Sequence, residues 1–218
     1  MNGTQRIYKF VYLNVGGGEK KLTADEIEGI YSSIKLLTIS DGGVGEKKFV
    51  NSTYGEMTFE GVEKLIAEAE IKAGEKFIDL GSGNGRAAMQ VFMNAEVAEA
   101  MGVEFHPERF MNAEAARKKL FKLRPELLDS PRLLTYQLQN IKDVYFLGDK
   151  HVVYMCSTCY PEELLGYVYE AIKDSKNIRC VITHKKYDRF KEFLPREKTA
   201  VLCCSWSKSL TWYLYLKS

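Results

Sequence analysis

One stretch of the chain, residues 76–86, constrains the fold more than any other. It reads KFIDLGSGNGR, an apolar run followed by three glycines at alternate positions: Gly81, Gly83 and Gly85. The apolar run is typical of a strand that is buried on both faces of a parallel sheet. The glycines permit backbone angles and a close ligand approach that a Cβ atom would prevent. We therefore predict a buried strand, a glycine turn and a helix that begins directly after the turn.

A carboxylate follows at the end of the next predicted strand. The segment AMGVE ends at Glu104, nineteen residues after Gly85, and an acid at this place can bind the hydroxyl groups of a ribose. The glycines are spaced GxGxG rather than GxGxxG, and Arg86 stands where a dinucleotide-binding turn needs a small residue. These features favour S-adenosylmethionine over NAD as the ligand. The alternative is a strand-to-helix turn that binds nothing.

Strand and helix patterns alternate along the rest of the chain. We predict helices that begin near Thr58 and end at Gly74, run from the glycine turn to about Asn94, and start at Pro107 and Pro161. Further strands are predicted at 133–136, 151–155 and 178–183, followed by a hairpin of 199–205 and 210–216. The alternation predicts an α/β fold with a doubly wound, parallel sheet. Its binding crevice should lie at the carboxyl ends of the strands.

The N-terminal part has a different pattern. Residues 7–14 are rich in strand formers and precede a glycine turn at 16–18, and Thr23 with Glu26 forms a capping box that predicts a helix. A polar, glycine-rich loop at 41–48 separates this part from the rest. We therefore predict an accessory segment, residues 1–50, and a main domain, residues 51–218.

Composition limits the possible partners and compartment. A net charge of +2 with 28% charged residues gives the whole chain no strong attraction to nucleic acid or membrane. Five cysteines, an odd number, and the lack of a signal peptide at the start predict a reducing, intracellular location. No apolar run approaches the length that crosses a membrane.

Several segments together resemble one family. YGEMTF at 54–59, the glycine turn and GVE at 102–104 resemble the non-SET histone-lysine methyltransferases, the disruptor of telomeric silencing family, and SWS at 205–207 with WYL at 212–214 is similar to its closing hairpin. The resemblance covers residue 52 to the end. It implies a Rossmann-like class I methyltransferase fold with seven strands and an antiparallel C-terminal hairpin. It also implies methyl transfer from S-adenosylmethionine to a lysine of a protein substrate, a histone or nucleosome, in the nucleus.

The same resemblance implies site residues. Tyr54 and Glu56 would belong to the loop over the methionine end of the cofactor. The remaining cofactor residues would be Asp79 and Gly81 at the amino acid part, Glu104 at the ribose, and Asn140 with Ile141 at the adenine; Gly83, Gly85 and Arg86 of the glycine turn would also bind the cofactor. The family places an asparagine and an aromatic residue after its fourth strand. This chain has CSTCYP there, which would put Ser157 near the transferred methyl group.

Four aromatic residues are candidates for a lysine channel: Tyr54, Tyr160, Trp206 and Tyr213. Burial in such a channel disfavours the ammonium form of an amine, and aromatic faces attract a sulfonium through cation–π contact. For each ring the alternative is ordinary core packing.

Other clusters point to weaker alternatives. Cys156 and Cys159 could form a redox pair or, with Cys203 and Cys204, a zinc site, but small buried hydrophobes are the simpler interpretation, and we predict no metal. Basic residues at 117–122 and 185–191 are interpreted as solvated helix faces or as contacts to an acidic partner or nucleic acid. The competing functions are a methyltransferase for RNA or a small molecule, and a cofactor-binding module without turnover.

Overall fold

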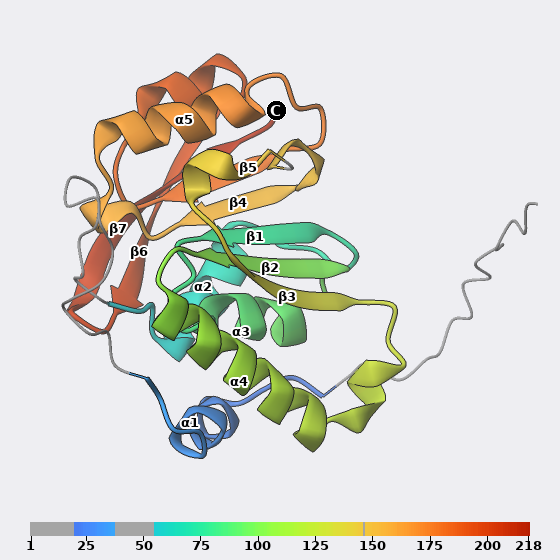
Figure 1. Ribbon diagram of the computed structural model, residues 1–218. Helices are drawn as coiled ribbons and strands as arrows, with labels where there is room; N and C mark the ends of the chain where they lie inside the picture. The colour runs from blue at the N-terminus through green and yellow to red at the C-terminus, as the bar shows by residue number, and fades with distance from the viewer. Residues whose placement is uncertain (1–19, 38–54, 146) are drawn as a thin grey trace, which may run out of the picture.

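A computed structural model describes residues 20–37, 55–145 and 147–218. Figure 1 shows its centre, a twisted sheet of seven strands. The strands are β1 (Lys76–Leu80), β2 (Glu99–Glu104), β3 (Leu133–Leu138), β4 (Val152–Met155), β5 (Cys180–Thr183), β6 (Arg196–Cys204) and β7 (Ser207–Leu216). Their order is β3-β2-β1-β4-β5-β7-β6, and β7 alone runs antiparallel to both of its neighbours. The predicted α/β class, mostly parallel sheet and antiparallel C-terminal hairpin are confirmed.

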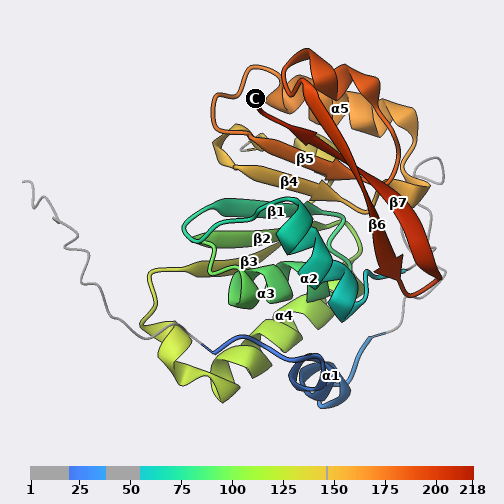
Figure 2. The same cartoon turned by 180° about the vertical axis from the view of Figure 1, so that it is seen from behind.

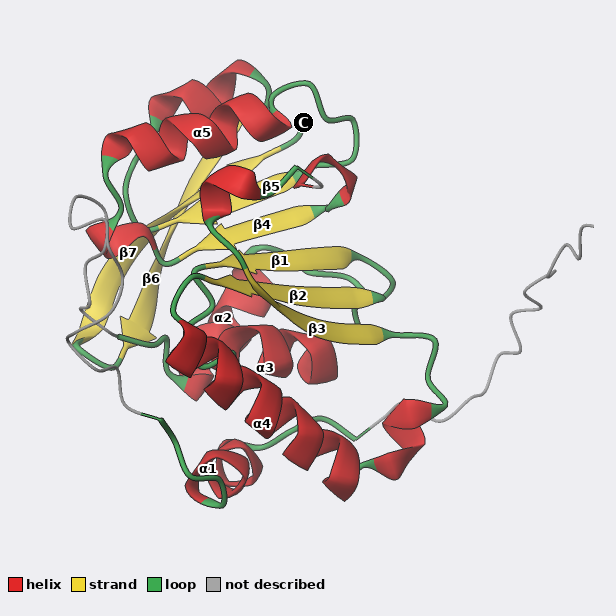
Figure 3. Ribbon diagram, viewed as in Figure 1, coloured by secondary structure: helices red, strands yellow, loops and turns green. Residues whose placement is uncertain are grey.

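Helices cover both faces of the sheet (Figures 2 and 3). They are α1 (Ala24–Ser32), α2 (Phe59–Glu68), α3 (Arg86–Asn94), α4 (Pro107–Leu123) and α5 (Glu162–Ile172). α2, α3 and α4 pack on one face, with α1 outside them against α4, whereas α5 lies on the other face. Strand β1 is buried on both faces, because its side chains alternate between them: Phe77 packs in the first hydrophobic cluster and Ile78 in the second.

The local signals mostly act as the sequence predicts. The Thr23 hydroxyl accepts from the Glu26 amide and the Glu26 carboxylate accepts from the Thr23 amide, so the capping box at α1 is confirmed. Thr58 caps α2 in a similar way. No helix in the described part of the chain is long and apolar enough to cross a membrane.

Several boundaries differ from the prediction, at α2 and in the hairpin above all. α2 ends at Glu68, and Gly74, at φ +80°, lies in the turn that leads into β1 instead of ending the helix. The hairpin is also longer than predicted, since β6 begins at Arg196 and β7 at Ser207, where pairing across the strands continues past the apolar runs. The predicted strand at 7–14, the turn at 16–18, the loop at 41–48 and the domain boundary at residue 50 lie outside the described residues.

Candidate active site

A cavity of about 480 Å³ lies at the carboxyl ends of the parallel strands. It sits beside β1, where β2 and β4 continue the sheet in opposite directions, which is the usual ligand site of such a sheet. Most of the predicted site residues line it: Glu56, Asp79, Gly81, Gly83, Arg86, Glu104, Asn140, Ile141, Tyr160 and Trp206. The first part of the turn, residues 81–83, and the carboxylate at 104 therefore face the same space, whereas Gly85, also predicted as a cofactor residue, lies against the Tyr136 ring and does not line the cavity.

The glycine turn is held by its own backbone. The amides of Gly81 and Ser82 donate to the Val103 carbonyl at 2.8 and 2.9 Å, and the Gly85 amide donates to the Ser82 carbonyl at 2.8 Å. Gly81 and Gly85 have φ values of +83° and +84°, and a Cβ atom on Gly81 would lie 1.9 Å from the Tyr160 hydroxyl. Glycine is therefore required at residue 81 for both its conformation and its space.

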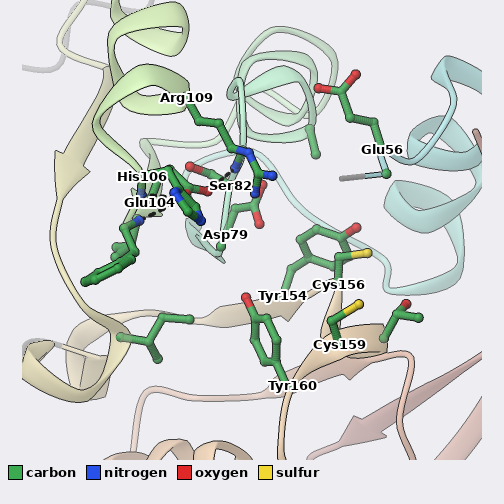
Figure 4. Close-up of a pocket in the computed structure, with 18 of the residues that line it drawn as sticks. Glu56, Asp79, Ser82, Glu104, His106, Arg109, Tyr154, Cys156, Cys159 and Tyr160 are labelled. Carbon is green, nitrogen blue, oxygen red and sulfur yellow. Dashed lines mark hydrogen bonds between the residues drawn. The ribbon is translucent and has the colours of Figure 1, made fainter. Parts of the chain in front are cut away.

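Glu104 is locked in place at the end of β2. Its side chain is 5% exposed, and one carboxylate oxygen accepts from the Gly83 amide at 2.8 Å. The other accepts from the amides of Phe105 and His106 at 2.9 and 2.8 Å. The carboxylate thus ties the glycine turn to the start of α4, and Figure 4 shows it beside Asp79 and Ser82.

Two polar atoms of the same wall lack partners. One carboxylate oxygen of Asp79, which is 2% exposed, and the Ser82 hydroxyl have no hydrogen bond within the described residues. Burial, and then the nearby carboxylates of Glu104 and Glu56, raise the pKa of Asp79 well above its usual range. Buried polar atoms are rarely left unpaired, so this wall is suited to a polar or cationic ligand.

The opposite wall is aromatic and uncharged. Tyr160 donates from its hydroxyl to the Leu80 carbonyl at 2.6 Å, and Tyr154, which the sequence interpretation missed, lines the cavity next to Cys156. Burial raises the pKa of the Cys156 thiol to about 12, so the thiol stays neutral. Trp206, 43% exposed, lies at the rim.

Two of the four proposed channel residues, Tyr54 and Tyr213, are not found among the described residues that line the cavity. Tyr54 lies outside the described residues. Tyr213 does not line the cavity but packs against the second hydrophobic cluster, because alternation along β7 directs Trp212 and Leu214 to one face of the sheet and Tyr213 to the other. The placement of Tyr213 in the channel was therefore wrong.

Ser157 also differs from the expectation. It is fully buried, its hydroxyl is 2.5 Å from that of Thr183, and it accepts from the Lys185 amide at 2.8 Å. A short 3-10 turn, Ser157–Cys159, rotates its side chain into the protein and leaves its neighbours Cys156 and Thr158 to line the cavity. The position near a transferred methyl group is thus wrong for Ser157, which instead joins the loop after β4 to the loop after β5.

We expect Ser157→Ala to act mainly on stability. The change leaves the Lys185 amide without its acceptor and removes one of the two hydrogen bonds of the Thr183 hydroxyl, which should cost about 1 to 3 kcal/mol. Chemical denaturation would show this loss, whereas affinity for the cofactor should change by less than about threefold. A large loss of cofactor affinity without a loss of stability would show that Ser157 does belong to the binding site.

The sequence interpretation missed three basic residues that line the cavity: His106, Arg109 and Lys142. His106 and Arg109 come from the start of α4, directly after Glu104. Burial lowers the pKa of Arg109, and the carboxylates of Glu104 and Glu56 oppose this. Pro107, which marks the first turn of α4, was the available signal, because the start of a helix after β2 faces the same edge of the sheet.

The cysteine alternative, and the partner contact predicted for the basic residues at 185–191, gain no support from the geometry. The described cysteines are free, and no group of three or more potential metal ligands occurs among the described residues. Lys185 points inward, donating from its ammonium to the Tyr160 carbonyl, whereas Lys191 pairs with Asp188 at the surface.

Comparison with known proteins decides the family. A family model described as "Histone methylation protein DOT1" matches residues 45–159, just over half of the chain. This chain belongs to the DOT1 histone methylation family. No curated protein matches the sequence.

Several solved structures have a similar fold, and some of them contain S-adenosylhomocysteine or S-adenosylmethionine. An RNA methyltransferase from Salinibacter ruber, in complex with S-adenosylhomocysteine, is 17% identical with a TM-score of 0.52, over 72% of this chain and 90% of that one. TrmK from M. capricolum, also with S-adenosylhomocysteine, is 10% identical with a TM-score of 0.51, over 74% and 69%. At such identities the likeness concerns the fold, which is the class I methyltransferase fold.

The DOT1-family chain is therefore an S-adenosylmethionine-dependent methyltransferase, and its cavity fits that cofactor. The unpaired Asp79 oxygen and Ser82 hydroxyl are suitable partners for an ammonium and other polar groups. Glu104, with three backbone amides on its two oxygens, retains acceptor capacity for a ribose hydroxyl. Asn140 and Ile141 line the same cavity, and their contact with the adenine stays a prediction.

Proposed function

We propose that this DOT1-family chain methylates the side-chain amine of a lysine in a protein, with a histone or nucleosome as its substrate. The observation that carries the proposal is the family match together with a cavity that is acidic on one wall and neutral and aromatic on the other. The acidic wall contains the carboxyl groups of Asp79, Glu104 and Glu56, whose oxygens can accept hydrogen bonds from the ammonium and hydroxyl groups of the cofactor. The neutral wall suits an acceptor that must shed its own charge.

The bound cofactor supplies a methyl group on a sulfonium, and the displacement needs no protein nucleophile. The task of this chain is to hold a neutral amine with its lone pair in line, which accounts for much of the rate. Tyr154, Cys156 and Tyr160 line a surface without charge, and such a surface disfavours an ammonium and excludes water. The amine loses one proton to solvent before transfer, and the methylated ammonium leaves as the product.

A second candidate function is methylation of RNA. It is favoured by the fold likeness to the Salinibacter RNA methyltransferase and TrmK, and by the CSTCYP loop in place of the family's asparagine. Small-molecule substrates and a module that binds the cofactor without turnover are further alternatives. A nuclear location belongs to the histone proposal alone.

Labelling with tritiated S-adenosylmethionine tests these functions. Purified histones, intact nucleosomes, total RNA and a cell lysate would be incubated in parallel with the chain and with Glu104→Ala as the inactive control. We expect label in histone bands, and its loss when histone lysines are first blocked by reductive methylation. Label in RNA alone would support the second function. Retained binding of S-adenosylhomocysteine without any label would support the module.

A further inference from the structure

Arg86, the first residue of α3, holds together two carboxylates from distant parts of the chain. Its Nε lies 3.0 Å from a Glu56 oxygen at the cavity, and its terminal nitrogens lie 2.5 and 3.5 Å from the two oxygens of Glu28 on α1. The guanidinium also lies over the Tyr31 ring, 4.1 Å from its centre. A guanidinium suits this place because its rigid, planar donors serve two acids while one face stacks on a ring.

Helix α1 is fixed to the cofactor turn by contacts that do not involve Arg86. Tyr31, which is 1% exposed, donates from its hydroxyl to the Asn84 carbonyl within the glycine turn at 2.8 Å. Two hydrogen bonds between Asn94 and the backbone of Leu22 hold the chain just before the helix. The carboxylate of Glu28 is therefore presented from a rigid support, although it is itself 68% exposed.

Glu56 is placed so that its charge depends on these neighbours. Burial raises its pKa to about 7; Arg86 opposes this rise, and Glu28 adds to it. The other groups that face it are the side chain of Asn84, which also lowers the pKa, Arg109 from α4, and Asp79 across the cavity. Near neutral pH, small changes in the surroundings of Glu56 therefore alter the fraction of Glu56 that is ionised.

We propose that helix α1 is part of the cofactor site: Arg86 pairs with Glu56 at the cavity wall, Glu28 on α1 shares the same guanidinium, and the two together control the charge of Glu56. An ionised Glu56 favours the positive sulfonium of S-adenosylmethionine over S-adenosylhomocysteine, which lacks that charge. The two compounds differ only in the methyl group on sulfur and the charge that it brings, so the change with pH in the ratio of their affinities reports the charge on the wall. This inference rests on the assignment of the cavity to this cofactor, and binding of either compound to the unmodified chain tests that assignment separately.

The test is calorimetric titration of the full chain with both compounds between pH 6 and 8.5. In the unmodified chain the affinity ratio should rise by about tenfold across this range, as Glu56 loses its proton. Arg86→Gln should move the midpoint of this rise upward by about one pH unit, because an opposing positive charge is gone. Glu28→Gln should move it downward, because a neighbouring negative charge is gone.

Arg189→Gln is the matched control. Arg189 also lies over a tyrosine ring, 3.9 Å from the centre of Tyr169, and pairs with Glu170 at 3.2 Å, but it does not line the cavity. The Arg189→Gln variant should leave the midpoint of the rise in the affinity ratio unchanged. Should Arg86→Gln fold poorly, the exposed Glu28→Gln still tests the inference.

Opposite shifts in the Arg86 and Glu28 variants would support the inference, since a merely structural role predicts no shift of either sign. Unchanged midpoints in both variants, or an equal shift in Arg189→Gln, would overturn it. If the unmodified chain binds neither compound, the cofactor assignment fails, and this inference fails with it.

Discussion

Glu104→Ala is expected to abolish measurable binding of S-adenosylmethionine, with an affinity loss of at least about 100-fold. The change removes the proposed ribose acceptor and also the partner of three backbone amides, those of Gly83, Phe105 and His106. Buried donors without partners cost about 1 to 3 kcal/mol each, so for the three amides together the unfolding free energy should fall by about 3 to 9 kcal/mol. Binding and stability should therefore fall together.

Two further variants separate these effects, with calorimetry and chemical denaturation as the measurements. Glu104→Gln keeps one acceptor oxygen, so its losses of cofactor affinity and of stability should both be smaller than those of Glu104→Ala. Glu99→Ala removes a carboxylate from the opposite end of the same strand, where it accepts from the buried Lys150 ammonium at 2.9 Å. It should lower stability and leave cofactor affinity within about twofold. Equal affinities in the Glu104 and Glu99 variants would show that the ribose lies elsewhere.

The features that the sequence could predict are those that depend on short segments. The glycines at 81–85 require positive φ angles or close approach, and the strand pattern on either side places Glu104 at the same edge of a parallel sheet. The capping box at Thr23 is likewise a contact across three residues. Such short-range signals predict the structure correctly because few tertiary contacts can override them.

The errors concern side-chain direction, which depends on the rest of the fold. Ser157 turns inward because Thr183 and the Lys185 backbone, more than twenty-five residues away, provide partners for its hydroxyl. Tyr213 faces the second cluster because the register of β7 against β5 sets its face. Neither partner is visible in the local sequence.

The role of α1 was missed for a related reason. Glu28 lies fifty-eight residues before Arg86, and an acid on an amphipathic helix normally faces solvent. Only the packing of α1 beside the glycine turn brings the two charges together. The predicted division into an accessory segment and a main domain therefore did not anticipate the contacts that connect α1 with the cavity.

Gly81→Ala is expected to lower the affinity for S-adenosylmethionine by about 50-fold. A Cβ atom at residue 81 would lie 1.9 Å from the Tyr160 hydroxyl, so Tyr160 must move and give up its 2.6 Å hydrogen bond to the Leu80 carbonyl. The φ of +83° adds strain for any residue with a Cβ, about 1 to 2 kcal/mol. The displaced Tyr160 and the new methyl group both alter the cofactor wall.

Gly74→Ala separates backbone strain from this steric effect. Gly74 has nearly the same φ, +80°, but a Cβ there would meet nothing within 4 Å, and it lies at the other end of β1. It should cost about 1 to 2 kcal/mol of stability from strain and leave the affinity unchanged. Chemical denaturation and calorimetry on both variants would measure the difference.

The double variant Gly81→Ala with Tyr160→Phe tests which contact matters. Phenylalanine removes the overlapping oxygen, and the nearest remaining ring atom is 3.2 Å from the position that the alanine Cβ would occupy, a tight but tolerable contact. If Tyr160 transmits the effect, the double variant should regain at least about tenfold in affinity over Gly81→Ala. If stability recovers but affinity does not, the Cβ itself excludes the cofactor. Unchanged affinity in Gly81→Ala would contradict the placement of the cofactor against this turn.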